Sequence, residues 1–259
     1  MYKWNLPKLK KIITRLAPLV LLVALLATTN SSLKFRHVDL KYEITPTQVS
    51  RYLPNRFQKT QIANCIRLKI KQMNFLTPID VIKQQVRRCI PEQFIYSVDK
   101  TPNTLKVNIP NVRFLAKYTN PQLNVYGFIF KQEGTYKTLI LGTPIPEDFQ
   151  HPMPGLYDFV YISNNQYPKN LKKIFIIADA LHQIPEFRVT KIEYVKHPAY
   201  PTLLKIYIND NFFFILDPNQ TLEDLENNIN KALLVYKYYQ KLNLQFKYID
   251  LRFDRIVVK

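Results

Sequence analysis

Apolar and polar positions alternate through the last sixteen residues of the chain, Leu244–Lys259. This is the period of a β-strand packed on one side, and it slips in phase near Asp250. We therefore expect two strands joined by a bulge or a tight corner. The stretch contains no proline or glycine, so it can pair along its whole length. A folded chain that stops in a strand leaves a sheet edge, which can accept a strand from another protein.

Residues 35–109 mix the periods of strands and helices. Phe35–Tyr42 alternates and predicts a strand. Thr45–Leu53 predicts a short helix, with Thr45 as the N-cap and Pro46 as the first helical residue. Cys65–Ile70 also alternates, and it stays open between a strand and part of a helix.

The next helix has clearer limits. Thr77 and Pro78 repeat the cap-and-proline start, and Pro91 ends the helix. Its apolar face consists of residues at helical spacing, namely Ile79, Ile82, Val86 and Ile90. We expect a hairpin after it, with its two strands and its turn at Phe94–Val98, Thr104–Ile109 and Asp99–Asn103.

The second half of the chain predicts further strands and two helices. Thr143–Asn170 is rich in proline and predicts a loop. Asn170 then caps a helix over Leu171–Leu181, and Thr221 with Asp224 starts a second helix in the manner of a capping box. The predicted strands are Leu123–Phe130, Phe187–Lys196, Leu203–Ile208 and Phe212–Leu216. The last of these is so apolar that it should be mostly buried.

The N-terminus has the pattern of a membrane-targeting segment. Five lysines and arginines lie in the first fifteen residues, before an apolar run. By the positive-inside rule, this predicts a cytoplasmic N-terminus and an anchor over residues 12–30. The run is shorter than the roughly 20 residues of a spanning helix, so a cleaved signal peptide is the alternative. In either case we expect everything after about residue 30 to be exported. The anchor would be formed by Leu16, Leu19, Val20, Leu21, Leu22, Val23, Leu25 and Leu26.

Composition narrows the possible partners. The chain of 259 residues is long enough for one large or two small domains. Its formal charge is +18, and 18 − 5 = +13 remains without the cations of residues 1–15. Such a surface can attract nucleic acid or anionic lipid. No long lysine and arginine run follows the N-terminal one, so we expect a solvated basic surface and no nucleic-acid partner.

The sequence offers few groups for catalysis. Its four histidines, His37, His151, His182 and His197, include no pair at metal-ligand spacing on one helix. Glu223, Asp224 and Glu226 crowd a helix start, where acids complement the helix dipole. We expect no enzymatic activity, no cofactor, no metal and no small-molecule substrate.

Two residue pairs leave alternatives open. Cys65 and Cys89 form a disulfide in an exported domain, or else they are free and buried. Asp250 and Arg252 point to the same face of an alternating strand. They either form an ion pair that pins the end of the sheet or contact a partner.

Several stretches resemble one family of bacterial proteins. Tyr248–Phe253, with the sequence YIDLRF, resembles the terminal signature of the FtsQ/DivIB family, bitopic division proteins of the cytoplasmic membrane. Pro102–Val107 resembles the second half of the family's POTRA domain, and Leu123–Phe130 with Thr138–Gly142 resembles strands of its C-terminal domain.

The resemblance implies a fold and a division of the chain. The implied class is α+β, with a single N-terminal transmembrane helix, a POTRA-like α/β domain and a C-terminal mixed β-sheet domain with flanking helices. The implied parts are a cytoplasmic tail (1–11), an anchor (12–30), a POTRA-like domain (31–118) and a β domain (119–259).

The resemblance also implies a function. It would be a non-enzymatic scaffold at the division septum, with its C-terminal domains outside the cytoplasmic membrane. It would link early and late division proteins by binding an FtsB/DivIC-like and FtsL-like pair at the C-terminal strand edge. The residues implied in this contact are Tyr248, Ile249, Asp250, Leu251, Arg252, Phe253, Ile256 and Val258. The alternatives are a POTRA-bearing secretion or outer-membrane assembly factor, and a secreted hydrolase.

Overall fold

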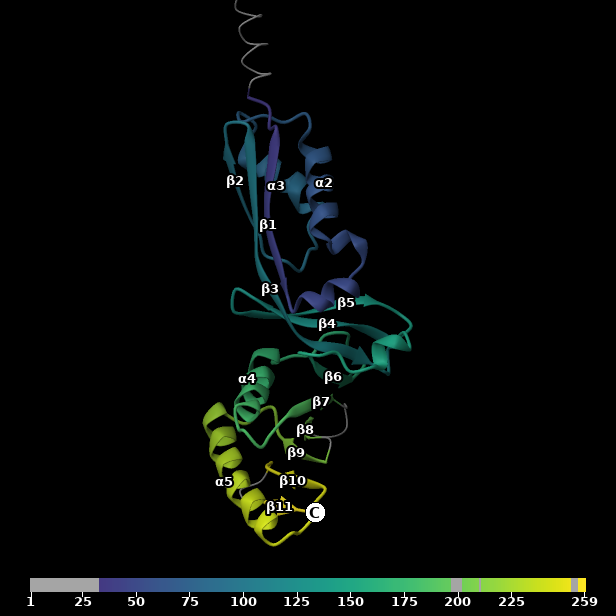
Figure 1. The fold of residues 1–259 in the computed structure, drawn as a ribbon, viewed down its shortest axis with the longest axis vertical. Coiled ribbons are helices and arrows are strands. Elements are labelled where there is room, and N and C mark those ends of the chain that lie inside the picture. Colours follow the sequence, from purple (N-terminus) through teal and green to yellow (C-terminus); the bar gives the residue numbers. More distant parts are fainter. Residues whose placement is uncertain (1–32, 197–201, 210, 253–255) are drawn as a thin grey trace, which may run out of the picture. The chain divides into compact units, whose positions relative to one another are not determined.

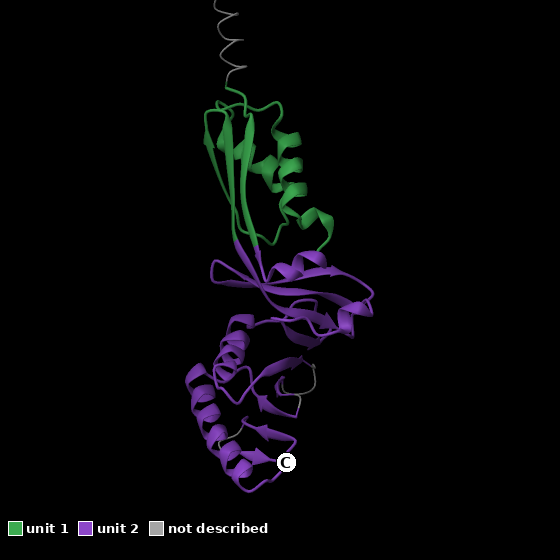
Figure 2. Ribbon diagram, in the orientation of Figure 1, with its two compact units in different colours: residues 1–43, 53–110 green, residues 44–52, 111–259 purple. Residues whose placement is uncertain are grey.

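The computed structural model describes residues 33–196, 202–209, 211–252 and 256–259. It has an α+β fold with a mixed sheet of eleven strands (Figure 1). The chain divides into two compact units, shown in Figure 2, with residues 53–110 in the first and 111–259 in the second. Residues up to 43 belong to the first unit, and residues 44–52 belong to the second. The boundary thus lies inside a strand, whereas the sequence placed it between residues 118 and 119.

The expected fold class requires a correction. It began with a transmembrane helix, but no helix within the described residues is long and apolar enough to cross a membrane. The segment predicted as the anchor, residues 12–30 with its eight apolar positions, lies outside the described residues.

The first unit is a three-stranded sheet with two helices. Its central strand, β3, pairs with β1 on one side and with β2 on the other. Two short 3-10 helices follow β1. The elements in chain order are β1 (His37–Thr45), η1 (Thr47–Arg51), η2 (Asn55–Phe57), α2 (Lys59–Ile70), α3 (Ile79–Arg87), β2 (Ser97–Thr101) and β3 (Thr104–Asn120), and of these η1 belongs to the second unit. β3 continues past Pro110 into the second unit.

The stretch that the sequence left open forms a helix. In α2, Ile62, Ile66 and Ile70 are buried at a spacing of four residues, which is a helical period. Leu68 makes the local sequence alternate like a strand, but its side chain is 75 % exposed. The alternation was therefore accidental.

The predicted N-caps of the first unit are wrong by one residue. Pro46 and Pro78 are the N-cap residues of η1 and α3, and neither helix has a side-chain cap. Thr45 instead donates a hydrogen bond to Asn111 Oδ1, at 3.2 Å. The helix predicted up to Pro91 is present but ends earlier, at Arg87, and its Ile82 and Val86 are fully buried.

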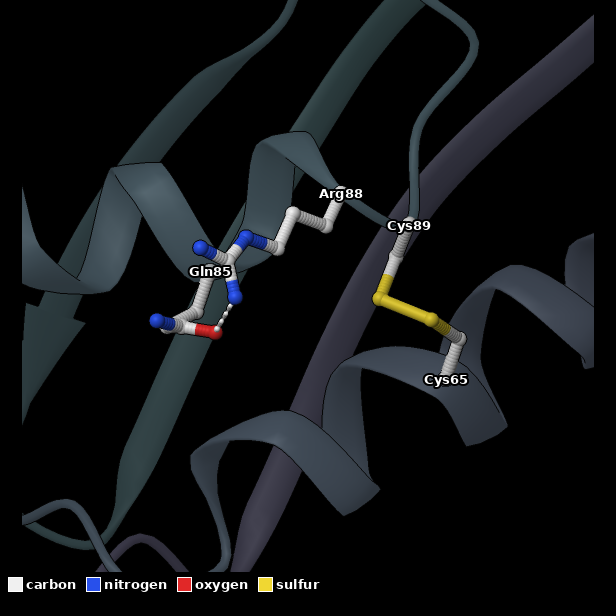
Figure 3. The surroundings of a disulfide bond; sticks show 4 residues. All are labelled: Cys65, Gln85, Arg88 and Cys89. Carbon is white, nitrogen blue, oxygen red and sulfur yellow. Dashed lines mark hydrogen bonds between the residues drawn. A yellow bond between two sulfur atoms is a disulfide. The ribbon is translucent and has the colours of Figure 1, made fainter.

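A disulfide links the two helices of the first unit. Cys65 on α2 bonds to Cys89, which lies two residues beyond the end of α3, and their Cα atoms are 5.7 Å apart (Figure 3). Beside it, Arg88 donates a hydrogen bond to Gln85, and both side chains point away from the sulfur atoms. The open alternative is thereby decided in favour of the disulfide.

The second unit contains the remaining strands and both long helices. Along the sheet the strands follow the order β11-β10-β9-β8-β7-β6-β3-β4-β5. The elements are β4 (Val125–Gln132), β5 (Thr135–Gly142), η3 (Asp148–Gln150), β6 (Tyr157–Ile162), α4 (Leu171–His182), β7 (Val189–Val195), β8 (Leu203–Ile208), β9 (Phe212–Leu216), α5 (Leu222–Lys241), β10 (Tyr248–Asp250) and β11 (Val257–Val258).

Strand β6 corrects the prediction of a loop over residues 143–170. It lies in the middle of the sheet, parallel to β3 on one side and to β7 on the other. Phe159 and Tyr161 are fully buried and alternate with half-buried residues. That alternation is visible in the sequence, although the surrounding prolines obscure it.

Helices α4 and α5 cover one face of the second unit's sheet (Figure 1). The apolar face of α4 is buried, and Phe175 stacks on Phe159 of β6. The predicted start of α5 is confirmed, because Thr221 Oγ1 accepts a hydrogen bond from Asp224 N at 3.1 Å. Leu222, the first residue of α5, is exposed.

Asparagines occupy most of the left-handed backbone positions. Among the described residues, six non-glycine residues have positive φ, and all but Glu133 are asparagines. Asparagine tolerates this region because its short polar side chain bonds locally. The five are Asn103, Asn124, Asn170, Asn209 and Asn243.

Candidate protein-binding edge of the sheet

The C-terminal residues form the last two strands of the sheet. β10 pairs in parallel with β9, and β11 pairs antiparallel with β10. The chain therefore reverses direction after Asp250, which confirms the predicted corner. Of the residues implied in partner binding, Phe253 lies outside the described residues.

The remaining implied residues differ in exposure. Ile249 and Leu251 are completely buried in the core under α5. Their side chains cannot contact a partner in this conformation, so they serve the fold. Tyr248, Arg252, Ile256 and Val258 are half-buried, and each leaves part of its side chain accessible.

Asp250 and Arg252 form the predicted ion pair. The guanidinium donates from Nε to Asp250 Oδ1 at 2.9 Å and from its terminal nitrogen to Oδ2 at 2.6 Å. The Asp250 side chain is 7 % exposed. The hydrogen bond with Asp250 raises the pKa of the Arg252 guanidinium. The pair thus holds the corner at the end of β10. Of the two alternatives, an ion pair that pins the end of the sheet or a contact with a partner, the structure has the ion pair.

Main-chain contacts with neighbouring elements fix the same corner. Leu251 N donates to Ile215 O of β9 at 2.8 Å, and Asn228 of α5 donates to Leu251 O at 3.2 Å. Gln220, just before α5, donates to Arg252 O at 3.2 Å. The corner is therefore held from the sheet and from the helix together.

β11 presents its main chain outward. Tyr248 and Lys259 exchange two hydrogen bonds, at 3.1 and 3.2 Å, and are therefore a hydrogen-bonded pair of the ladder. The next pair in register, Ile249 with Val258, must then be a non-hydrogen-bonded pair. The N–H and C=O of Val258 consequently point away from β10. Among the described residues no strand pairs with this outer edge of β11.

A row of side chains crosses the sheet face opposite α4 and α5. Strand register aligns Lys191, Tyr207, Phe213 and Tyr248 on four adjacent strands. The ring centroids lie 5.0 Å apart for Tyr207 and Phe213, and 5.6 Å apart for Phe213 and Tyr248. Lys191 Nζ lies 5.0 Å from the centre of the Tyr207 ring. The row thus continues from Tyr248, beside the edge strand, across the open face.

A polar cluster accompanies this row. Glu193 accepts hydrogen bonds from Tyr207 at 2.9 Å and from Lys205 at 3.2 Å. Burial alone would raise the pKa of Glu193, but these bonds and the charge of Lys205 outweigh it, so the pKa is lowered. Burial and the Glu193 carboxylate raise the pKa of Tyr207 to about 12.

Sequence reasoning missed the row because its members lie on four separate strands. The signal available in the sequence was the alternation within each strand. Tyr207 and Phe213 alternate with fully buried neighbours, so they lie on the outer face of the sheet. Joining them requires the parallel pairing of β9 with β10, which no local pattern reveals.

A groove of about 1140 Å³ lies at the start of β6 and β7 and the end of α4. Its charged lining is mixed, with the cations Arg113, Arg188 and Lys191 and the acids Asp158 and Asp179. Asp158 already pairs with buried Lys117 at 2.8 Å. The groove therefore has no clear charge preference.

The described residues offer no candidate metal site. They contain no group of three histidine, cysteine, aspartate or glutamate side chains that could hold a metal ion. His37, His151 and His182 are exposed at separate places, and His197 lies outside the described residues.

Two comparisons with known proteins found no match. The chain matches no model of a known protein family. It also matches none of the curated proteins.

Proposed function

We propose that the protein is a non-enzymatic scaffold of bacterial cell division, of the FtsQ/DivIB kind, which binds a strand of a partner along the outer edge of β11. The observation that carries the proposal is the outward direction of the Val258 main chain on an unpaired edge. Main-chain hydrogen bonds would provide affinity, and side chains near the edge would select the partner.

The resemblance names the partners that we propose. They are a small FtsB/DivIC-like protein and an FtsL-like protein, joined to this chain at the division septum. Because Ile249 and Leu251 are buried, selection would depend on Tyr248, on the accessible part of Arg252 and on Val257, which is 47 % exposed.

Two further features support the proposal. The first unit ends in the order helix, strand, strand (α3, β2, β3), which fits the resemblance to the second half of a POTRA domain. The disulfide between Cys65 and Cys89 suits an oxidising compartment outside the cytoplasm. The proposed location of both units is therefore the outer side of the cytoplasmic membrane.

Photo-crosslinking in dividing cells tests the partner. A photoreactive amino acid at Val257 should capture a small division protein that mass spectrometry identifies. The same probe at Leu234 on α5, which is 71 % exposed against 47 % for Val257, is the control and should not capture it. Absence of any adduct from positions 248–258 would overturn the proposal.

A proline at Val258 tests the mode of binding. It removes an outward N–H without removing a bond to β10, so it should weaken partner binding about five- to thirtyfold while leaving the fold intact. Val258→Thr keeps both the N–H and the branched side chain, and it should bind normally. Equal affinity of the Val258→Pro protein and the wild type, measured with the captured partner, would exclude strand addition at this edge.

A further inference from the structure

We infer that the end of the first unit nearest the N-terminus binds the surface of an anionic lipid bilayer. We call this end the tip and define it as residues 33–37, 67–77 and 100–104. Its charges, two outward leucines and its position in the chain support the inference independently of the proposed partner edge.

The three segments of the tip are held together by the main chain and by one lysine. Lys34 and Asn74 form an antiparallel bridge, and Arg36 N donates to Asn103 O at 2.8 Å. Lys100 Nζ donates to Phe75 O at 2.6 Å and to Thr77 O at 2.8 Å. The tip is thus a built surface rather than three independent loops.

Two leucines point into solvent from this surface. Leu68, near the end of α2, is 75 % exposed, and Leu76 is 68 % exposed. Hydrogen bonds fix the backbone around Leu76. Asn74 Oδ1 accepts them from the main-chain N–H of Leu76 and of Thr77, at 3.0 and 3.1 Å. The fold therefore holds an apolar side chain outward.

Cations surround the two leucines. The three segments contain six lysines and arginines and no aspartate or glutamate. Lys100 is used inside the tip, and the other five, Lys34, Arg36, Arg67, Lys69 and Lys71, are exposed. Within residues 33–110 none of these five forms an ion pair. Exposed apolar residues among cations are the composition of a surface that lies in the headgroup region of an anionic bilayer.

The place of the tip in the chain favours lipid over a soluble polyanion. In the sequence, residues 33–37 of the tip follow closely on the uncharged apolar run Leu16–Thr29. A soluble polyanion would use the cations but would leave both leucines in water, whereas a bilayer accommodates both kinds of side chain.

A tryptophan placed at the tip reports contact with lipid locally in the full chain. Trp4, the single natural tryptophan, is replaced by phenylalanine. Leu76→Trp and Leu68→Trp are then compared with Leu234→Trp on α5, a matched leucine that is 71 % exposed. The vesicles are phosphatidylcholine with brominated chains, with or without phosphatidylglycerol. We expect at least about twofold stronger quenching at positions 68 and 76 than at 234, in phosphatidylglycerol vesicles and at low salt.

Charge variants complete the test. In the Leu76→Trp protein, Lys69→Gln with Lys71→Gln should reduce the quenching by about half or more. Lys41→Gln with Lys106→Gln removes the same charge from exposed sites elsewhere in the first unit and should leave the quenching unchanged.

Three outcomes would overturn the inference. The first is quenching of the Leu76→Trp protein that is no stronger than that of the Leu234→Trp protein. The second is equal quenching of the Leu76→Trp protein with and without phosphatidylglycerol. The third is a fluorescence response of the Leu76→Trp protein to soluble polyphosphate but not to vesicles.

Discussion

At the scale of single residues, the Asp250–Arg252 ion pair should make a clear contribution to the free energy of unfolding. Replacing Arg252 by alanine leaves a nearly buried carboxylate without its main partner, which should lower the free energy of unfolding by about 2–3 kcal/mol. Arg252→Lys keeps the charge but not the two parallel bonds and should lose less. Urea unfolding of both variants, with Asp250→Asn to close a double-mutant cycle, measures the coupling. A loss below about 0.5 kcal/mol for Arg252→Ala would mean that the pair behaves like an exposed one.

Glu193 supplies a dependence on pH at the same scale. Its pKa is lowered in the folded protein, below its ordinary value of 4.5, so the ionised carboxylate stabilises the fold above that value. The contribution is lost as pH falls through the folded pKa. The difference in unfolding free energy between wild type and Glu193→Gln should therefore be constant near neutral pH and shrink below about pH 4.5. Tyr207→Phe should remove part of the same difference, and a difference that grows in acid would contradict the assignment.

At the scale of elements, Gly127 sets how closely β4 and β5 approach. A Cβ atom at this position would lie 1.9 Å from the carbonyl oxygen of Leu139, and neither backbone can move without breaking the ladder. Gly127→Ala should cost more than about 2 kcal/mol of stability. Gly142→Ala is the control, because its Cβ would meet nothing closer than the Tyr126 ring at 3.5 Å. Thermal unfolding compares the two, and equal melting temperatures would show that the strands yield.

Local pattern predicted most elements but not all of them. The helical spacing of buried residues predicted α3 and α4, and the capping box located the start of α5. α2 was not recognised because Leu68 is exposed, and the sequence does not distinguish an exposed leucine from a buried one. β6 was missed because proline density marks a loop, whereas these prolines lie outside the strand. In the C-terminal stretch the period indicated the reversal of the chain, but not which side chains are buried, since that depends on α5.

At the scale of the whole molecule, the parts that escaped prediction are the long-range ones. β3 pairs with β6, β6 with β7 and β9 with β10, all in parallel and all across intervening segments. Parallel neighbours require a crossover, so their partners are chosen by tertiary packing rather than by adjacent sequence. The candidate edge was foreseeable as a terminal strand, whereas the aromatic row beside it depends on these pairings.

The asparagines at left-handed turns have a consequence for how this protein can be encoded. Glycine is the usual residue at such positions, yet the chain has four glycines and places five asparagines where φ is positive. Glycine codons begin with two guanines and asparagine codons with two adenines. The turns of this fold can thus be written in an adenine-rich gene, at a small conformational cost for each turn, without giving up the reversals that bring eleven strands into one sheet.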